Sequence, residues 1–247
     1  MKKTLKIFSW GIVIFVIVAV GGFVIWASNP LGPGEQALSA LESDASVTVE
    51  ITDDWITFQP VGAEPRTGFI FYPGGRVDYR SYAPALHEIA AQGYLVVLVP
   101  APLNMMFFDI DAAQPVIDHF AKINYWAIGG HSLGGAMAAN FVYTNPTAAD
   151  ALVLWASYPA ESNDLTNSGL KVLSLHGTLD MAGEEAFTAS RSLLPENTIW
   201  LVIEGGNHAQ LGDYGAQPGD NPATISAAEQ QAQAIQATVE LLALLDK

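Results

Sequence analysis

Short apolar runs alternate with longer helical segments through most of the chain, and this alternation constrains the fold more than any other feature. The runs are rich in Val, Ile and Leu and occupy residues 67–72, 94–100, 125–130, 151–157, 171–177 and 198–206. Helices are predicted at residues 81–93, 112–122, 133–143, 183–194 and 225–245. Continuous apolar strands separated by helices form a parallel sheet that is covered on both faces. The sequence therefore predicts an α/β fold.

A hairpin is predicted before the alternating region. Residues 47–51 and 55–59 alternate apolar with polar side chains, and the Thr-Asp-Asp sequence between them is typical of a turn. With the six later strands, the hairpin predicts a mostly parallel, eight-stranded sheet with helices on both faces. We place this domain at residues 46–247 and take Ser81 as the candidate N-cap of its first long helix.

The N-terminal region has the composition of a membrane segment. Residues 7–27 contain no charged side chain and are mostly Ile, Val, Phe, Trp and Gly, whereas Lys2, Lys3 and Lys6 precede them. An apolar helix of this length crosses a hydrocarbon core of about 30 Å. The lysines favour a cytoplasmic N-terminus. We therefore expect a single-pass transmembrane helix that keeps the rest of the protein on the extracytoplasmic side of the cell membrane.

Two interpretations of this region remain open. In the first, residues 1–28 are a permanent anchor (a signal-anchor), and the turn-rich residues 29–45 link it to the domain. In the second, the apolar run is a signal sequence that is cleaved to release a secreted protein. The length of the run and the poor cleavage site at residues 25–27 favour the anchor.

Charge and composition exclude several functions. The chain has 10 basic and 25 acidic residues, a net charge of −15, and no cysteine. A field of that sign repels nucleic acid, which we exclude as a partner. Without cysteine there is neither a thiolate nucleophile nor a disulfide framework. The five histidines are scattered and no H-E-x-x-H motif occurs, so we expect no metal and no cofactor.

One serine stands between glycines at a predicted strand-to-helix junction. The sequence from Gly130 to Gly134, Gly-His-Ser-Leu-Gly, matches G-x-S-x-G. A tight turn at this point would lift the Ser132 hydroxyl above the sheet and set it at a helix N-terminus, where negative charge is favoured. The strand before the motif and the helix after it favour a nucleophile over an ordinary turn residue.

A serine nucleophile needs a base and an acid that orients the base. In this arrangement they follow the serine in the order acid and then histidine, each after a later strand. Asp180 follows the run at 171–177, and His208 follows the run at 198–206. Asp164 is the alternative acid, and His176 is a candidate hydrogen-bond partner for Asp180.

Two backbone N–H groups are needed to bind an oxyanion. The first candidate is Leu133, directly after the serine. The second lies in the glycine-containing loop after residues 67–72, where Gly75 is favoured and Arg76 is the alternative. Glycine allows a backbone N–H to approach a ligand closely.

The loop after residues 94–100 contains Met105, Met106 and Phe107. It is predicted to lie at the same edge of the sheet, where these side chains would form an apolar substrate pocket. The alternative is that they fold back into the core. The loop before residues 171–177 is short, which predicts an open site with little or no cap domain.

Together these motifs resemble the α/β-hydrolase superfamily. The resemblance is carried by the glycine loop "FYPGGRVDYRSYAP" and by "GHSLGG", "HGTLD" and "GGNHAQ" in that order, and it covers residues 46–245. It is most similar to small bacterial hydrolases of the dienelactone-hydrolase-like group. The resemblance implies a triad of Ser132, His208 and Asp180 that cleaves esters through an acyl-enzyme. Dienelactone hydrolases proper use a cysteine nucleophile, so lactone specificity is not carried over.

The expected substrate is a small-molecule carboxylic ester with a short or medium acyl chain. A thioesterase or an exopeptidase would use the same triad, so both remain alternatives. A third alternative is an anchored binding protein without catalysis, which the presence of all three triad residue types disfavours.

Overall fold

The computed structural model describes residues 2–246, without the side chains of residues 2–9 and 11. Its eight strands form one sheet in the order β1-β2-β4-β3-β5-β6-β7-β8. The strands are β1 Val47–Ile51, β2 Ile56–Pro60, β3 Thr67–Tyr72, β4 Leu95–Leu98, β5 Tyr125–His131, β6 Ala151–Trp155, β7 Lys171–Gly177 and β8 Ile199–Ile203. Only the pairs β1–β2 and β2–β4 are antiparallel. The prediction of an eight-stranded, mostly parallel sheet is confirmed.

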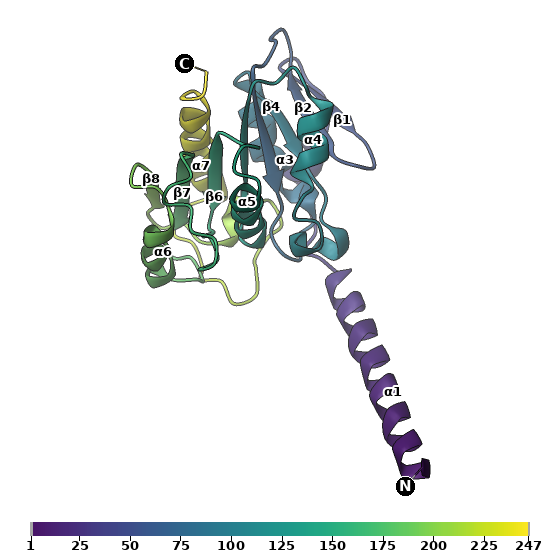
Figure 1. Cartoon of the computed structure of the whole chain (residues 1–247). Helices are drawn as coiled ribbons and strands as arrows, with labels where there is room; N and C mark the ends of the chain where they lie inside the picture. The colour runs from purple at the N-terminus through teal and green to yellow at the C-terminus, as the bar shows by residue number, and fades with distance from the viewer. Residues whose placement is uncertain (1, 247) are drawn as a thin grey trace.

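Helices cover both faces of the sheet (Figure 1). The α-helices are α1 Lys2–Ala27, α2 Glu35–Ser39, α3 Ala83–Ala91, α4 Ala113–His119, α5 Leu133–Thr144, α6 Glu184–Ser190 and α7 Ala227–Leu242. Short 3-10 turns are η1 Tyr79–Tyr82, η2 Pro102–Asn104, η3 Met106–Phe108, η4 Arg191–Leu193 and η5 Ala209–Leu211. Each α-helix of the domain agrees with a predicted segment. Helices α3, α4, α6 and α7 are shorter than predicted, and 3-10 turns occupy one end of α3 and one end of α6.

The core consists of two layers, one on each face of the sheet. Phe69 and Phe71 of β3 pack with α3 and α7, whereas Ile70 and Tyr72 pack on the opposite face with α4 and α5. Successive side chains of a strand point to opposite faces of the sheet. Every residue of β3 is buried, so both of its faces are covered by core. A strand that is apolar on both faces can be satisfied only by helices on both sides.

The prediction that Ser81 caps the first long helix is wrong. Ser81 lies inside the 3-10 turn η1, and α3 starts after it at Ala83. The N-cap of η1 is Asp78, whose carboxylate accepts the Arg80 N–H at 3.0 Å. Pro84 lies in the first turn of α3, where its fixed φ and its missing N–H are compatible with the start of a helix.

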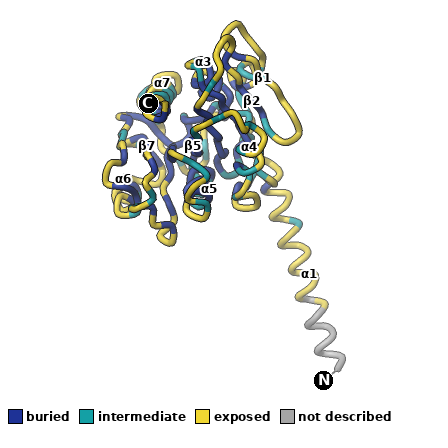
Figure 2. The backbone as a smooth tube through the Cα atoms, turned by 45° about the horizontal axis from the view of Figure 1, so that its top comes forward, coloured by how far each residue is buried: buried dark blue, intermediate teal, exposed yellow. Residues whose placement is uncertain are grey.

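Helix α1 projects from the domain (Figure 1), and most of its described residues are exposed (Figure 2). No helix in the described part of the chain meets the length and hydropathy of a membrane span. Beyond α1, the predicted linker lies on the domain rather than apart from it. Leu31 pairs with Val77, and Ala37 is fully buried.

Candidate active site

Ser132 stands at the sharp turn between β5 and α5, with φ 53° and ψ −121°. A left-handed φ is uncommon for a residue with a side chain and costs about 1–3 kcal/mol. The neighbouring glycines permit the turn. A Cβ at Gly130 would lie 2.5 Å from Tyr72 O, and one at Gly134 would overlap the backbone oxygens of Tyr72 and Pro73. Close approach to the end of β3 and the loop after it therefore requires glycine at both positions of the G-x-S-x-G motif.

Hydrogen bonds to β6 and to the loop directly after it hold the backbone of Ser132. Its N–H donates to Trp155 O at 3.0 Å, and its C=O accepts the Ser157 hydroxyl at 2.6 Å. Ser132 also precedes the 12 residues of α5, whose first N–H groups carry partial positive charge. The turn therefore fixes Ser132 beside the positive end of a helix dipole.

His208 and Asp180 are in contact although they follow different strands. The Nδ1–H of His208 donates to Asp180 Oδ2 at 2.9 Å, and both side chains are buried. The other carboxylate oxygen of Asp180 accepts the Ala182 N–H at 2.8 Å. The alternative acid, Asp164, is exposed and accepts hydrogen bonds from Thr166, which lower the pKa of its carboxyl group. The acid that the structure brings to His208 is thus Asp180.

Ser132 and His208 line one small cavity of about 210 Å³. The other lining residues are Leu133, Ala136, Ala156, Ser157, Tyr158 and Ala182. Within the described chain, no hydrogen bond joins the Ser132 hydroxyl to the His208 imidazole. Such bonds are often long before substrate binds. Ser157, Tyr158 and Ala182 were not singled out from the sequence, although Ser157 ends a predicted strand and the other two follow predicted strands within a few residues, which was the available signal.

A chain of hydrogen bonds connects the loop after β3 to His208. The Gly74 N–H donates to the Tyr82 hydroxyl at 3.0 Å, and that hydroxyl donates to His131 Nδ1 at 2.8 Å. His131 Nε2–H then donates to His208 O at 3.1 Å. These partners assign the proton of the neutral His131 ring to Nε2. Tyr82 lies in the quoted stretch FYPGGRVDYRSYAP, but no pattern in the sequence indicated this hydrogen bond.

His131 and Tyr82 are kept neutral by their surroundings. Burial, and secondly the proximity of His208, hold the pKa of the His131 imidazole well below its usual value. Burial raises the pKa of the Tyr82 hydroxyl. Charging either group would place a charge among buried groups and disrupt one of these hydrogen bonds. The hydrogen-bonded series from Gly74 to His208 therefore requires both side chains to be neutral.

The two candidate oxyanion donors are adjacent. A Cβ at Gly75 would lie 3.1 Å from Leu133 Cδ2, so the two loops touch. Neither the Gly75 nor the Leu133 N–H donates a hydrogen bond within the described residues. The alternative donor, Arg76, is already engaged, because its N–H donates to Asn104 O at 2.8 Å. The structure therefore leaves Gly75 as the free donor of this loop.

The three predicted pocket residues have different environments. Met106 is fully buried in the core with Ile70, as the alternative interpretation held. Met105 is buried near Gly75, whereas Phe107 is exposed to solvent. None of the three lines the cavity at Ser132. Because Met105 lies beside Gly75 while Met106 belongs to the core, a substrate pocket formed by all three residues stays a prediction.

His176 does not support Asp180, contrary to expectation. Its Nε2–H donates to Glu184 Oε2 at 2.8 Å, and its ring stacks on Phe187 with centroids 3.9 Å apart. The side chain is held against α6 by this stacking, which keeps it from the Asp180 carboxylate. The bond to His176 also lowers the pKa of the Glu184 carboxyl group.

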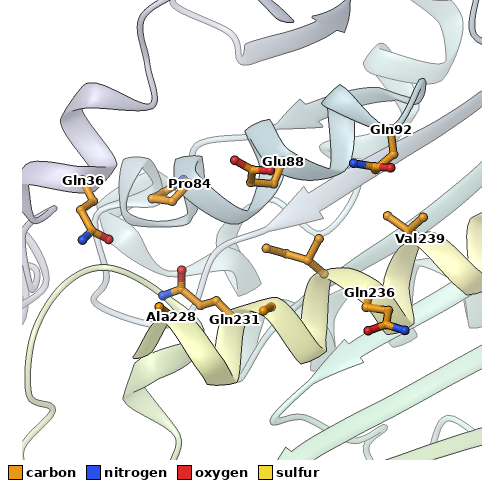
Figure 3. Close-up of a pocket in the computed structure, with 10 residues that line it drawn as sticks. Gln36, Pro84, Glu88, Gln92, Ala228, Gln231, Gln236 and Val239 are labelled. Atoms are coloured by element: carbon orange, nitrogen blue, oxygen red, sulfur yellow. The ribbon is translucent and has the colours of Figure 1, made fainter. Parts of the chain in front are cut away.

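A larger hollow lies away from these residues. It has a volume of about 550 Å³ and is formed by α2, α3 and α7, with Gln36, Glu88, Gln231 and Gln236 among its walls (Figure 3). It contains no pair of acid and base and none of the motif residues. Volume alone therefore does not locate the chemistry. In the described chain, no group of three His, Asp or Glu residues is placed to hold a metal.

A parallel sheet with a strained serine at a strand-to-helix turn, and with a buried His–Asp pair after its last two strands, defines an α/β-hydrolase architecture. The sequence comparison agrees: residues 68–232 match the model of the alpha/beta hydrolase family. The chain belongs to that family. A search of curated protein sequences found no match.

Solved structures share the fold at low sequence identity. A dienelactone hydrolase-like promiscuous phosphotriesterase from metagenomic libraries has 17% identity and a TM-score of 0.62, over 81% of this chain and 99% of that one. A predicted CIB-like hydrolase from Thermoplasma acidophilum has 16% identity and a TM-score of 0.59, over 79% and 99%. A thermostable esterase from Pseudomonas putida has 15% identity and a TM-score of 0.54, over 84% and 86%.

Proposed function

We propose that the protein is a serine hydrolase that cleaves carboxylic esters through an acyl-enzyme formed on Ser132. The observation that carries this proposal is the placement of His208 on the cavity of Ser132, with its Nδ1–H bonded to Asp180 at 2.9 Å. A buried carboxylate in that position orients the imidazole and supports the positive charge that forms on it.

The reaction has two halves. In the first, Ser132 Oγ attacks the acyl carbon while His208 Nε2 takes its proton, and the Leu133 and Gly75 N–H groups bind the oxyanion. The intermediate collapses, the alcohol leaves with the proton from Nε2, and the acyl group stays on Ser132. In the second, water attacks this ester while His208 Nε2 takes a proton from it; the intermediate collapses, Nε2 returns that proton to Ser132 Oγ, and the carboxylic acid is released.

The site favours a small acyl group. A volume of about 210 Å³ lies below the ~300–1,000 Å³ of ligand pockets in general, and Ala136, Ala156 and Ala182 contribute small walls. Between β6 and β7, residues 156–170 form only turns and irregular backbone, so this segment places no helix over the site. Thioesters and aminoacyl amides would meet the same residues, and a substrate panel separates these alternatives.

We also propose that α1 attaches the protein to the cell membrane with the domain on the extracytoplasmic side. The proposal is supported by the uncharged sequence of residues 7–27 after three lysines and by the exposed apolar side chains of the described part of α1. Sedimentation of the full chain with membranes after alkaline washing would be the expected result, and release into the wash would contradict attachment.

Labelling with a fluorophosphonate probe tests the proposed nucleophile. Wild type is expected to be labelled and to hydrolyse a soluble butyryl ester, and Ser132→Ala is expected to lose both properties. The matched control is Ser192→Ala, an exposed serine away from the cavity, which should behave as wild type. A folded wild type that takes no label, or a Ser132→Ala variant that keeps the label, would contradict the proposal.

A further inference from the structure

Helix α1 has exposed apolar side chains on every side. Residues 12–18 are consecutive apolar residues with exposed fractions between 47% and 72%, and seven residues make almost two helical turns. A partner protein would cover one face of such a helix, whereas lipid covers all of them. The occupant that fits this surface is therefore the acyl region of a lipid layer.

The C-terminal end of α1 is fixed to the carboxyl edge of the sheet. Arg76, after β3, donates to Trp26 O at 3.1 Å, and its guanidinium lies 4.3 Å from the centre of the Trp26 ring. Asn104, after β4, donates to Ala27 O at 2.9 Å. Ser132 follows β5, which pairs directly with β3. Helix α1 thus leaves the domain at the edge that carries the candidate site (Figure 1).

The apolar surface of α1 continues onto the loop after β4. We call this continuation the apolar rim; it consists of Phe23, Trp26, Leu103, Phe107 and Phe108, each exposed by more than a third. Phe23 contacts Phe108 with ring centroids 6.2 Å apart, and Phe107 contacts Phe108 at 4.4 Å. A continuous exposed apolar surface of this kind marks an interaction site, and here it joins a lipid-compatible helix to the edge that bears Ser132.

We infer that this edge faces the lipid surface and that the substrate is an ester of a short acyl group with an alcohol that resides in the lipid layer. The inference rests on the proposed esterase function and membrane attachment. The small cavity accepts only the short acyl group, so the rest of the substrate must lie outside it. With the apolar rim in contact with lipid, the part outside the cavity reaches Ser132 from the lipid side. The rim therefore acts in substrate delivery and not in the chemical step.

The test compares two butyryl esters of the same kind of leaving group, one of which carries an alkyl chain that holds it in lipid. One is the butyryl ester of a hydroxycoumarin with a hexadecyl chain, embedded in phosphatidylcholine vesicles. The other is the butyryl ester of the unmodified hydroxycoumarin in solution. For full-length wild type bound to the vesicles, we expect hydrolysis of the embedded ester to depend on the apolar rim.

The test variant is Leu103→Asp/Phe108→Asp, which places charges on the apolar rim. Withdrawing two apolar side chains from lipid is expected to lower the embedded-ester rate at least about tenfold and to leave the soluble-ester rate unchanged. Val61→Asp is the matched control, because Val61 is 52% exposed, close to the 50% of Phe108, but lies at the opposite edge of the sheet. It should alter neither rate. Should the double variant lose the soluble rate through misfolding, Phe108→Asp alone replaces it.

The outcomes separate the inference from the function on which it rests. Equal embedded-ester rates for the rim variant and wild type, or loss of the rate in Val61→Asp alone, would overturn the inference while the soluble-ester activity stands. A wild type that hydrolyses neither ester would instead refute the esterase proposal. Wild type that acts on the soluble ester but does not bind vesicles would refute the lipid-facing site.

Discussion

The hydroxyl of Tyr82 is expected to matter for both stability and turnover, and Tyr82→Phe removes it without changing the shape of the ring. The variant leaves two buried groups without a partner, the Gly74 N–H and His131 Nδ1. Each such group costs about 1–3 kcal/mol, so the free energy of unfolding should fall by about 2–6 kcal/mol. Because Gly74 precedes Gly75, the candidate oxyanion donor should also lose its fixed position.

A second tyrosine provides a control with the same chemistry. The Tyr72 hydroxyl donates to Ile110 O at 2.7 Å and accepts the Ala113 N–H at 2.8 Å, but neither partner belongs to the site. Tyr72→Phe should therefore lose a similar amount of stability by the same mechanism. It should keep its kcat, because the loop at Gly75 and the backbone of His208 keep their hydrogen bonds.

The assay measures urea unfolding and steady-state hydrolysis of the soluble butyryl ester for both variants. Complete loss of one oxyanion donor costs about 10²–10³ in kcat, so a displaced donor in Tyr82→Phe should lower kcat about tenfold with little change in KM. Equal kcat values for the two variants at similar stability would show that the Tyr82–His131 chain is only structural. A loss of kcat in Tyr72→Phe alone would refute the reasoning.

Three further predictions concern the turn, the acid and pH. Gly134→Ala should fail to fold or lose about 3 kcal/mol or more in urea unfolding, since its Cβ overlaps backbone oxygens; a stable, active variant would contradict the assigned turn. Asp180→Asn should lower kcat by about 10⁴ whereas Asp164→Asn should not, and the reverse result would reassign the acid. Burial holds the pKa of His131 low, so below pH ~6.5 the unfolded chain binds a proton that the folded chain does not. As the pH decreases below that value, the free energy of unfolding should therefore fall by about 1.4 kcal/mol per pH unit. His131→Asn should lack this component, and an identical pH slope in urea unfolding would contradict it.

The fold was predictable from the sequence because its signals are local. Apolar strands with no polar face require helices on both sides, and the G-x-S-x-G spacing between an apolar run and a helical segment marks the serine turn. These patterns can be recognised without knowing which strands are neighbours. Helix ends were less predictable: Ser81 was a reasonable N-cap by residue type, but Asp78 and Pro84 set a different start.

The sequence alone thus determined the sheet, the family and the position of the serine turn. Only the tertiary structure decided which acid contacts His208, that Arg76 is an occupied donor, that His176 bonds Glu184, and that Met106 belongs to the core. It also revealed Tyr82, 49 residues from its partner His131, and the attachment of α1 to the edge that bears Ser132. Most of these contacts join segments distant along the chain, and residue type fixes what a side chain can bond to but not which neighbour the packed fold will bring to it.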